Sequence, residues 1–319
     1  MKPYPYAPLV IFLITGCGLA PQPSSIDPDS VRVETTRTLT EARQGFQTKL
    51  TGPSHVQEEV PEPPARLFRT VRYESPVGKL AAYLTPDPKD GKKHPAIIWI
   101  TGGDYYSIGE SSWTAFKPSN DQSASAYRKA GIVMMRPSLR GGNDNPGRRE
   151  GFLGEVDDVV AAAEFLSKQE YVDPNRIYLG GHSTGGTLAL LVAECSDRFR
   201  AVFSFGPTAD IRTYGHEYVT CDRSNTIEIK LRSPAYWFAS VKNPTFVLEG
   251  AVQGNTELLM IMEQMANNPK VKFIPVDGAN HFSLLAPTNR LIANKILRDT
   301  GPECNVTLTE NEVNAANAK

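Results

Sequence analysis

The chain has 319 residues, of which 40% are hydrophobic and 22% are charged, as in an ordinary globular protein. Its 34 lysine and arginine residues almost balance its 35 aspartate and glutamate residues, which leaves a formal net charge of -1. This balance argues against a nucleic-acid-binding protein, which needs a basic surplus, and against an acidic disordered chain. No apolar run reaches the roughly 18 to 20 residues that a membrane-spanning helix requires.

The N-terminus has the features of an export signal. Lys2 precedes a short apolar run at 9–14, and small residues follow that run, a pattern typical of secretory signals. The string L-I-T-G-C at 13–17 also resembles the bacterial lipoprotein signal, whose cysteine becomes lipid-modified. The resemblance predicts a signal peptide at 1–16 and a protein anchored in the cell envelope by a lipid on Cys17. An ordinary cleaved signal with an incidental cysteine is the alternative.

Residues 17–64 are predicted to form a tether and an N-terminal segment. Proline and serine dominate the stretch directly after Cys17, and residues 52–64 are again rich in proline and glutamate. Residues 31–50 carry scattered apolar side chains, which could form a strand or pack on the edge of a domain.

Export would also permit disulfide bonds. Apart from Cys17, the chain has three cysteines, so at least one stays unpaired. Cys221 and Cys304 lie in loop-like sequence and are the expected pair. Cys195 ends an apolar helical run and is expected to be a buried free thiol. None of the cysteines has the spacing of metal ligands.

From residue 65 onward, short apolar runs alternate with helical patterns. Strands separated by helices indicate βαβ units and a mostly parallel sheet, opened here by an antiparallel hairpin. We therefore predict one α/β domain at 65–300 with an eight-stranded sheet flanked by helices, a short insertion after the sixth strand, and a C-terminal tail at 301–319. The predicted strands cover 67–73, 80–84, 96–100, 131–136, 176–180, 201–205, 245–248 and 271–276, and the predicted helices cover 123–129, 152–169, 184–194, 256–267 and 284–297.

A glycine-rich turn at 181–185 carries the candidate nucleophile. The stretch G-H-S-T-G follows a predicted strand and opens a predicted helix, a context in which a sharp turn holds the serine exposed. The helix that starts at Thr184 directs its first amides and the positive end of its dipole at the site. Ser183 is therefore the predicted nucleophile, and a crossover turn with an ordinary serine is the alternative.

A serine hydroxyl needs a base to take its proton. His281 follows the last predicted strand and precedes the last predicted helix, so it lies at the carboxyl edge of the sheet together with Ser183. His182 lies inside the turn and is expected to pack or to hydrogen-bond locally. His281 is the predicted general base, in preference to the more remote His55, His94 and His216.

Several motifs from about residue 65 to 300 occur together in the order of a known family. They are R-P-S-L-R-G-G at 136–142, G-E-V-D-D at 154–158, Y-V-D-P-N-R-I at 171–177, the turn at 181–185 and R-S-P at 232–234. With these motifs the region resembles the α/β-hydrolase superfamily, specifically the catalytic domain of prolyl-oligopeptidase-like serine hydrolases without their β-propeller. The resemblance implies an oxyanion hole made by the amide of Thr184 and by an amide of Gly103 or Asp104, with the hydroxyl of Tyr105 as an alternative donor.

The acid of the triad is where the chain departs from the family it resembles. The family acid is expected three residues after the glycine that closes the seventh strand, where this chain has Gln253. A neutral glutamine cannot stabilise an imidazolium as a carboxylate does. Glu249, at the end of that strand, is the preferred acid and keeps the order serine, acid, histidine. Asp210 and Asp277 are the alternatives, and a site without an acid is a further one.

These residues predict a serine hydrolase that cleaves an ester or an amide bond through an acyl-enzyme, with no metal or organic cofactor. The expected substrate is a small ester or a peptide, and the membrane is contacted only through the lipid anchor. The insertion at 208–243 has no readable specificity motif, and its aromatic residues either line an acyl site or pack on the sheet. The competing hypothesis, favoured by Gln253, is a non-catalytic or weakly active envelope binding protein on a hydrolase scaffold.

Overall fold

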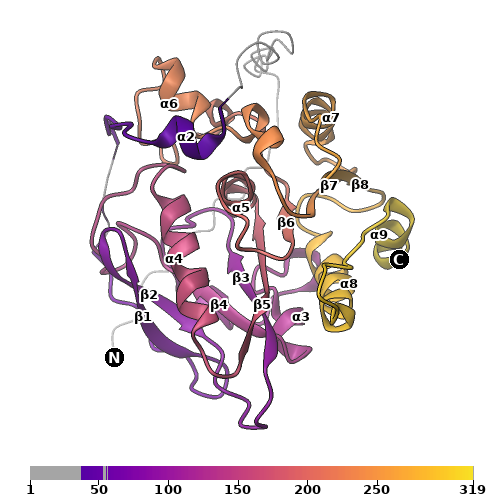
Figure 1. The fold of residues 1–319 in the computed structure, drawn as a ribbon. Helices are drawn as coiled ribbons and strands as arrows, with labels where there is room; N and C mark the ends of the chain where they lie inside the picture. Colours follow the sequence, from indigo (N-terminus) through magenta and orange to yellow (C-terminus); the bar gives the residue numbers. More distant parts are fainter. Residues whose placement is uncertain (1–36, 53–54, 56, 319) are drawn as a thin grey trace, which may run out of the picture.

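One eight-stranded sheet organises the chain, whose computed structural model describes residues 37–52, 55 and 57–318. The strands lie in the order β1-β2-β4-β3-β5-β6-β7-β8 (Figure 1). The opening hairpin is antiparallel, β2 also meets β4 antiparallel, and all other neighbours are parallel, which confirms the predicted fold class. The strands are β1 (Arg69–Ser75), β2 (Gly78–Leu84), β3 (His94–Ile100), β4 (Val133–Pro137), β5 (Val172–His182), β6 (Val202–Phe205), β7 (Thr245–Gly250) and β8 (Val271–Val276).

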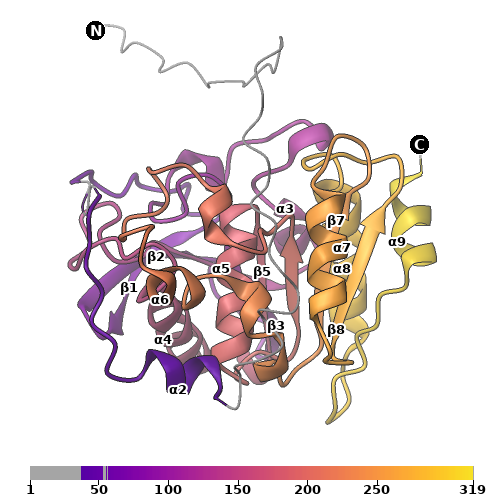
Figure 2. The ribbon, with the colours of Figure 1, turned by 90° about the horizontal axis from the view of Figure 1, so that it is seen from above.

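Two apolar clusters form the core, one on each face of the sheet. Successive side chains of a strand point to opposite faces, so Ile98 and Ile100 of β3 join one cluster while Ile97 and Trp99 join the other. Side chains of α4, α5 and α7 complete the first cluster, and side chains of α3, α8 and α9 complete the second. Figures 1 and 2 show α4 and α5 beside each other over the first face.

The described helices are α2 (Leu39–Arg43), α3 (Ser125–Lys129), α4 (Glu155–Ser167), α5 (Thr184–Cys195), α6 (Thr226–Lys230), α7 (Thr256–Met265), α8 (Leu285–Arg298) and α9 (Glu310–Asn317). Short 3-10 turns occur at η1 (Glu110–Ser112), η2 (Pro118–Asn120), η3 (Ile211–Thr213), η4 (Pro234–Tyr236) and η5 (Phe238–Ser240). Because η3, α6, η4 and η5 all fall between β6 and β7, the insertion predicted after the sixth strand is built from short helical turns.

Segments before residue 65 and after residue 300 also contribute to the core. Leu39 of α2 is fully buried in the first cluster, and Val313 of α9 is fully buried in the second. Each of these two helices begins with a capping box, in which Thr38 pairs with Glu41 and Thr309 pairs with Glu312. The predicted domain boundaries at 65 and 300 stay a prediction.

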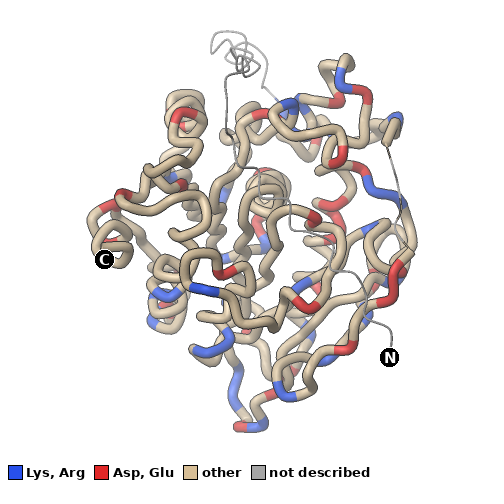
Figure 3. The backbone as a smooth tube through the Cα atoms, turned by 180° about the vertical axis from the view of Figure 1, so that it is seen from behind, with Lys and Arg blue, Asp and Glu red and all other residues tan. Residues whose placement is uncertain are grey.

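The predicted signal peptide at 1–16 and the predicted lipidation site Cys17 lie outside the described residues. Within the part of the chain that the structure describes, no helix has both the length and the apolar character to cross a bilayer. Basic and acidic residues, which are almost equal in number, are interspersed along the tube in Figure 3.

The expected disulfide between Cys221 and Cys304 is wrong, because both thiols are free. Cys221 is buried in the cluster on the first face of the sheet, whereas Cys304 packs against the cluster on the second face. The sheet therefore lies between the two cysteines, and loop-like sequence alone could not reveal this. Cys195 is also free, as expected, and is partly buried.

Candidate active site

The turn between β5 and α5 holds Ser183 in a strained conformation. Its φ of 55° and ψ of -118° are unusual for a residue with a side chain, and they match the sharp strand-to-helix turn predicted from the glycine pattern. A Cβ atom at Gly181 would come within 2.2 Å of the Gly185 carbonyl oxygen, and one at Gly185 within 2.4 Å of the Ile100 oxygen. Both glycines are therefore required by the close approach of the backbone around Ser183.

His281 and Glu249 form a hydrogen-bonded pair at the same sheet edge. His281 Nδ1 lies 3.0 Å from Glu249 Oε2 and 3.3 Å from Oε1, although 31 residues separate the two in the chain. Glu249 is 1% exposed and also accepts a bond from the amide of Gly250 at 2.8 Å. The histidine side chain keeps 18% of its surface exposed, so the ring is reachable from solvent.

The end of β6 brings this pair next to Ser183. The amide of Ser183 donates to the carbonyl of Phe205 at 2.7 Å. The next residue, Gly206, has a φ of +57°, and a Cβ there would lie 2.3 Å from His281 Cε1 and 3.0 Å from Glu249 Oε2. Ser183 thus contacts Phe205, while His281 and Glu249 lie against the next residue, Gly206.

The two alternative acids lie elsewhere. Asp210 is buried and caps η3, and its carboxylate is occupied by the guanidinium of Arg212 at 2.6 Å. Asp277 is exposed and binds the side-chain amide of Asn314. Gln253, at the expected family position, is exposed in the turn after β7. Of the three carboxylates considered from the sequence, Glu249 is the one that contacts His281.

The loop after β3 lies against the turn that holds Ser183. The hydroxyl of Thr184 donates to the carbonyl of Gly103 at 2.9 Å, and a Cβ at Gly102 would lie 3.1 Å from Ser183 Cβ. Thr184 is the first residue of α5, so its amide has no acceptor within the helix. These contacts place the loop at 102–103 against the first residue of α5.

The side chains of that loop point to other partners. The carboxylate of Asp104 is 3.2 Å from the guanidinium of Arg149. Tyr105 is 2% exposed, and its hydroxyl donates to the hydroxyl of Tyr106 at 2.9 Å. Its ring also stacks on Phe152. These contacts disfavour the Tyr105 hydroxyl as the alternative oxyanion donor.

His182 was expected to hydrogen-bond locally, and it does so with the histidine loop. Its Nε2 lies 2.9 Å from the backbone oxygen of His281, and the two rings are 4.6 Å apart between centroids. Gln122 reaches the Nδ1 of His182 at 3.2 Å. Burial, and to a smaller degree the nearby His281, lowers the pKa of His182 to about 3, so this ring is neutral at ordinary pH. The sequence pattern contains no signal for the contact with Gln122.

Aromatic residues of the insertion pack inward. Tyr214 stacks on Phe152 with 5.6 Å between ring centroids, and its hydroxyl is 2.7 Å from the hydroxyl of Thr187 on α5. Trp237 and Phe238 are at most 7% exposed and belong to the first apolar cluster. These residues therefore support the packing alternative for the insertion.

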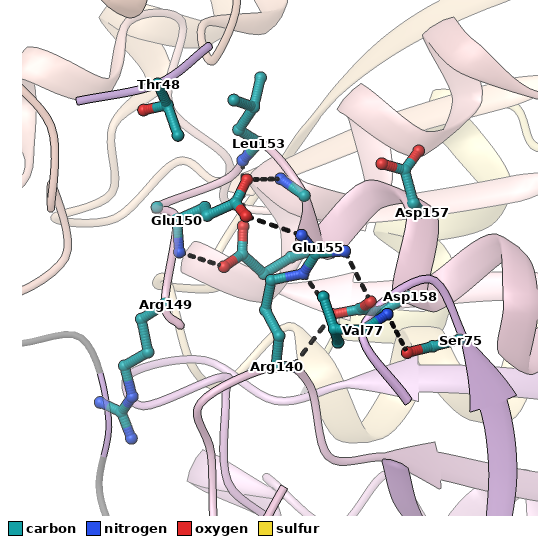
Figure 4. A network of polar contacts seen from close by, with 12 residues as sticks. Thr48, Ser75, Val77, Arg140, Arg149, Glu150, Leu153, Glu155, Asp157 and Asp158 are labelled. Atoms are coloured by element: carbon teal, nitrogen blue, oxygen red, sulfur yellow. Dashed lines mark hydrogen bonds and ion pairs between the residues drawn. The ribbon is translucent and has the colours of Figure 1, made fainter. Parts of the chain in front are cut away.

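A second polar network surrounds Arg140, in the first segment that carries the family resemblance (Figure 4). Arg140 binds both carboxylate oxygens of Asp158 at 2.9 Å and the carboxylate of Glu150 at 2.8 Å. Glu155 is fully buried and accepts bonds from the amides of Glu150 and Leu153. Burial raises the pKa of Glu155 to about 7, partly offset by Arg140.

Comparison with known proteins connects this geometry to a family. The model of the prolyl oligopeptidase family matches residues 118–268, which include Ser183 and Glu249, while His281 lies beyond the match. Prolyl oligopeptidase A of Amanita bisporigera is 35% identical over 112 residues, 33% of this chain and 13% of that protein. The dual function macrocyclase-peptidase POPB of the same fungus is 27% identical over 153 residues, 46% of this chain and 18% of that protein. This chain thus spans less than a fifth of the length of these two relatives.

Solved structures share the fold at low sequence identity. Dipeptidyl peptidase 4 of Porphyromonas gingivalis superposes with a TM-score of 0.56 at 18% identity, over 72% of this chain and 35% of that one. The acylaminoacyl peptidase of Pyrococcus horikoshii superposes with a TM-score of 0.57 at 17% identity, over 77% and 44%. The chain therefore has the α/β-hydrolase fold, and its residues 118–268 are similar to the model of the prolyl oligopeptidase family.

Proposed function

We propose that this chain is a serine hydrolase in which Ser183 is the nucleophile, His281 the general base and Glu249 the acid. The observation that carries the proposal is the contact of His281 with Glu249 beside a serine held in a strained strand-to-helix turn. A nucleophile, a base and a group that orients the base form the arrangement that activates a weak hydroxyl nucleophile.

The proposed reaction follows from the two nitrogens of the histidine. Nδ1 faces the carboxylate of Glu249, so it carries the proton and Nε2 is free to accept the proton of Ser183. The Ser183 oxygen attacks a carbonyl carbon, and the positive charge on His281 is stabilised by Glu249. His281 then returns the proton to the leaving alcohol or amine, which leaves an acyl-enzyme. A water molecule, deprotonated by the same histidine, then attacks the acyl-enzyme. This step releases the carboxylic acid product and restores Ser183.

The negative charge that forms on the carbonyl oxygen needs donors. We assign this role to the amide of Thr184 and an amide of Gly103 or Asp104, because the bond from the Thr184 hydroxyl to the Gly103 oxygen joins these two segments. Removing one such donor costs roughly a hundred- to a thousand-fold in turnover in serine hydrolases.

The substrate class is proposed to be an ester or a peptide. The prolyl oligopeptidase relatives carry peptidase names, which supports a peptide or amide bond. A panel of p-nitrophenyl esters of increasing acyl length and aminoacyl naphthylamides, proline among them, would rank the two kinds of bond by kcat/KM.

Labelling with a fluorophosphonate tests the proposal directly. We expect the wild-type protein and the control variant Ser224→Ala to be labelled, because Ser224 is an exposed serine of the insertion. Ser183→Ala should be neither labelled nor active. Equal labelling of wild type and Ser183→Ala, with both folded, would instead favour the binding protein on a hydrolase scaffold.

We also propose export and lipid anchoring through Cys17, which rests on the N-terminal sequence alone. Expression in a bacterium with a radiolabelled fatty acid tests it: the wild-type chain should take up label and sediment with the envelope. Cys17→Ser should lose both properties, and uptake of label by this variant would contradict the proposal.

A further inference from the structure

His182 occupies a position that the proposed reaction does not use. It is the last residue of β5 and is 1% exposed, with its ring against the loop after β3: a Cβ at Gly102 would lie 2.9 Å from its Nδ1. A buried imidazole costs free energy unless both its nitrogens find partners. The partners found here come from two other segments of the chain, Gln122 and His281.

The partners determine which nitrogen carries the proton. The backbone oxygen of His281 can only accept, so Nε2 of His182 donates to it across 2.9 Å. Both polar atoms of the Gln122 side chain lie near the other nitrogen, with Nε2 at 3.2 Å and Oε1 at 3.3 Å from Nδ1. In the neutral ring with its proton on Nε2, Nδ1 accepts a hydrogen bond from Nε2 of Gln122. A neutral ring satisfies both contacts at once, in agreement with the effect of burial on this group.

The contact acts on the residue that carries the proposed base. Glu249 holds the ring of His281, but the position of that ring also depends on the position of the His281 backbone. The bond from His182 holds the peptide group of His281 itself. The Phe282 ring also makes T-shaped contacts with the rings of His182 and His281, at 5.6 Å and 5.0 Å between centroids. The neutral state of His182 also avoids a second positive charge 4.6 Å from the ring that becomes protonated during the reaction.

We propose that His182 is a positioning residue, a neutral hydrogen-bonded bridge that joins the loop bearing Gln122 to the backbone of His281 and so aligns the base with Ser183. The inference rests on the proposed function, and it assigns a role to the residue before the nucleophile. It differs from simple packing because it requires the donor at Nε2.

Two substitutions separate the hydrogen bond from the volume of the ring. His182→Gln keeps an amide donor near the position of Nε2, whereas His182→Phe keeps an aromatic ring and removes the donor. Because misplacement by about 1 Å can cost on the order of a hundred-fold in rate, we expect His182→Phe to lower kcat about ten- to a hundred-fold with KM changed less than about threefold. His182→Gln should stay within about threefold of wild type in kcat. His94→Phe, at the start of β3, is the control and should leave both constants unchanged.

The kinetic outcomes decide the proposal. An equal loss of kcat in His182→Phe and His182→Gln, with melting temperatures near that of wild type, would show that volume and not the donor matters. Wild-type kcat in a folded His182→Phe would also overturn the inference. A selective loss in His182→Phe supports it.

A second measurement does not depend on activity. In ¹⁵N-histidine-labelled protein, His182 should show the neutral form with the proton on Nε2 between pH 5 and pH 8. The ring resonances of His281 should shift in His182→Phe and stay close to wild type in His182→Gln. A proton on Nδ1 of His182, or a charged ring, would overturn the inference. If Ser183 proves unreactive while these resonances behave as expected, the proposed function fails and the hydrogen-bonded bridge stands.

Discussion

Two buried polar clusters follow strands of the same sheet, and they differ in how completely their groups are paired. In the cluster around Arg140 (Figure 4), the guanidinium binds two carboxylates and the backbone amides nearby bind Glu155. In the active-site cluster, Nδ1 of His281 contacts both carboxylate oxygens of Glu249, and the histidine side chain remains partly exposed. The hydrogen bonds of the first cluster join a loop to α4, whereas in the second cluster the proposed reaction uses the other ring nitrogen of His281, Nε2.

The two clusters differ in what their charged groups do: those around Arg140 stabilise the fold, and those around His281 are proposed to take part in proton transfer. Substitution of one member of a buried ion pair lowers the stability of the fold, because the remaining charge is left buried without a partner. A site that performs proton transfer needs a group whose lone pair can accept a proton near the reacting atom. Variants of the two clusters should therefore fail in different ways, one in activity and the other in stability.

The largest expected effect is on activity, in Glu249→Gln. The amide keeps the shape of the carboxylate but cannot stabilise the imidazolium, and it allows the wrong tautomer of His281. We expect kcat to fall about 10⁴-fold while the melting temperature changes little. Steady-state hydrolysis of the best p-nitrophenyl ester measures it, with the exposed Asp277→Asn as the control. Unchanged turnover in a folded Glu249→Gln would remove Glu249 from the triad.

Next in size is the loss of stability in Arg140→Met. The substitution leaves the fully buried carboxylate of Asp158 without its partner, so the free energy of unfolding should drop by about 3–5 kcal/mol. Urea unfolding followed by circular dichroism measures the drop. Arg198→Met, which breaks an exposed pair with Glu164, should cost less than about 1 kcal/mol. Similar costs for the two variants would show that the first network is not a buried ionic one.

The pH dependence of stability should have opposite signs for His182, which contacts His281, and for Glu155, in the cluster around Arg140. His182 has a folded pKa of about 3 against 6.5 in the unfolded chain, so the unfolded state binds more protons between these values. Its contribution to stability is therefore present above about pH 6.5 and is lost as pH falls toward 3. His182→Gln should flatten this rise by on the order of 4 kcal/mol, measured by urea unfolding from pH 4 to pH 8. A slope identical to that of wild type would contradict the neutral buried ring.

Glu155 should act in the other direction, with a smaller magnitude. Its folded pKa of about 7 exceeds the value of 4.5 for the unfolded chain, so its contribution is complete below about pH 4.5 and is lost as pH rises through 7. Glu155→Gln should gain stability relative to wild type over this range, on the order of 3 kcal/mol. The exposed Glu164→Gln serves as the matched control, and a difference that does not change with pH would refute the assignment.

The smallest expected effect is that of a reductant. Since Cys195, Cys221 and Cys304 are free thiols, dithiothreitol should leave the melting temperature of the domain unchanged. Thiol titration of the unfolded, non-reduced domain lacking residues 1–36 should find all three. A melting temperature that falls on reduction would point to a disulfide.

The sequence was most informative where the structure depends on neighbouring residues. The mostly apolar stretch V-K-F-I-P-V at 271–276 predicts a strand with the bounds that β8 has, and the glycines at 181–185 predict the turn that strains Ser183. Both signals are local: side-chain alternation or a close backbone approach needs only a few consecutive residues. Placement of His281 at the sheet edge followed from the order of strands and helices alone.

Contacts between distant segments depended on the tertiary structure. Glu249, Asp210 and Asp277 were all compatible with the sequence, and the packing of β7 beside the histidine loop is what brings Glu249 to His281. The sheet likewise separates Cys221 from Cys304, which loop-like sequence had suggested as a pair. The sequence by itself therefore determined the strands of the sheet, the five helices predicted between residues 123 and 297 and the turn that holds the serine, whereas α2, α6 and α9 were not predicted. Only the tertiary structure decided which side chains meet across loops, because a contact depends on positions in space that no local pattern records.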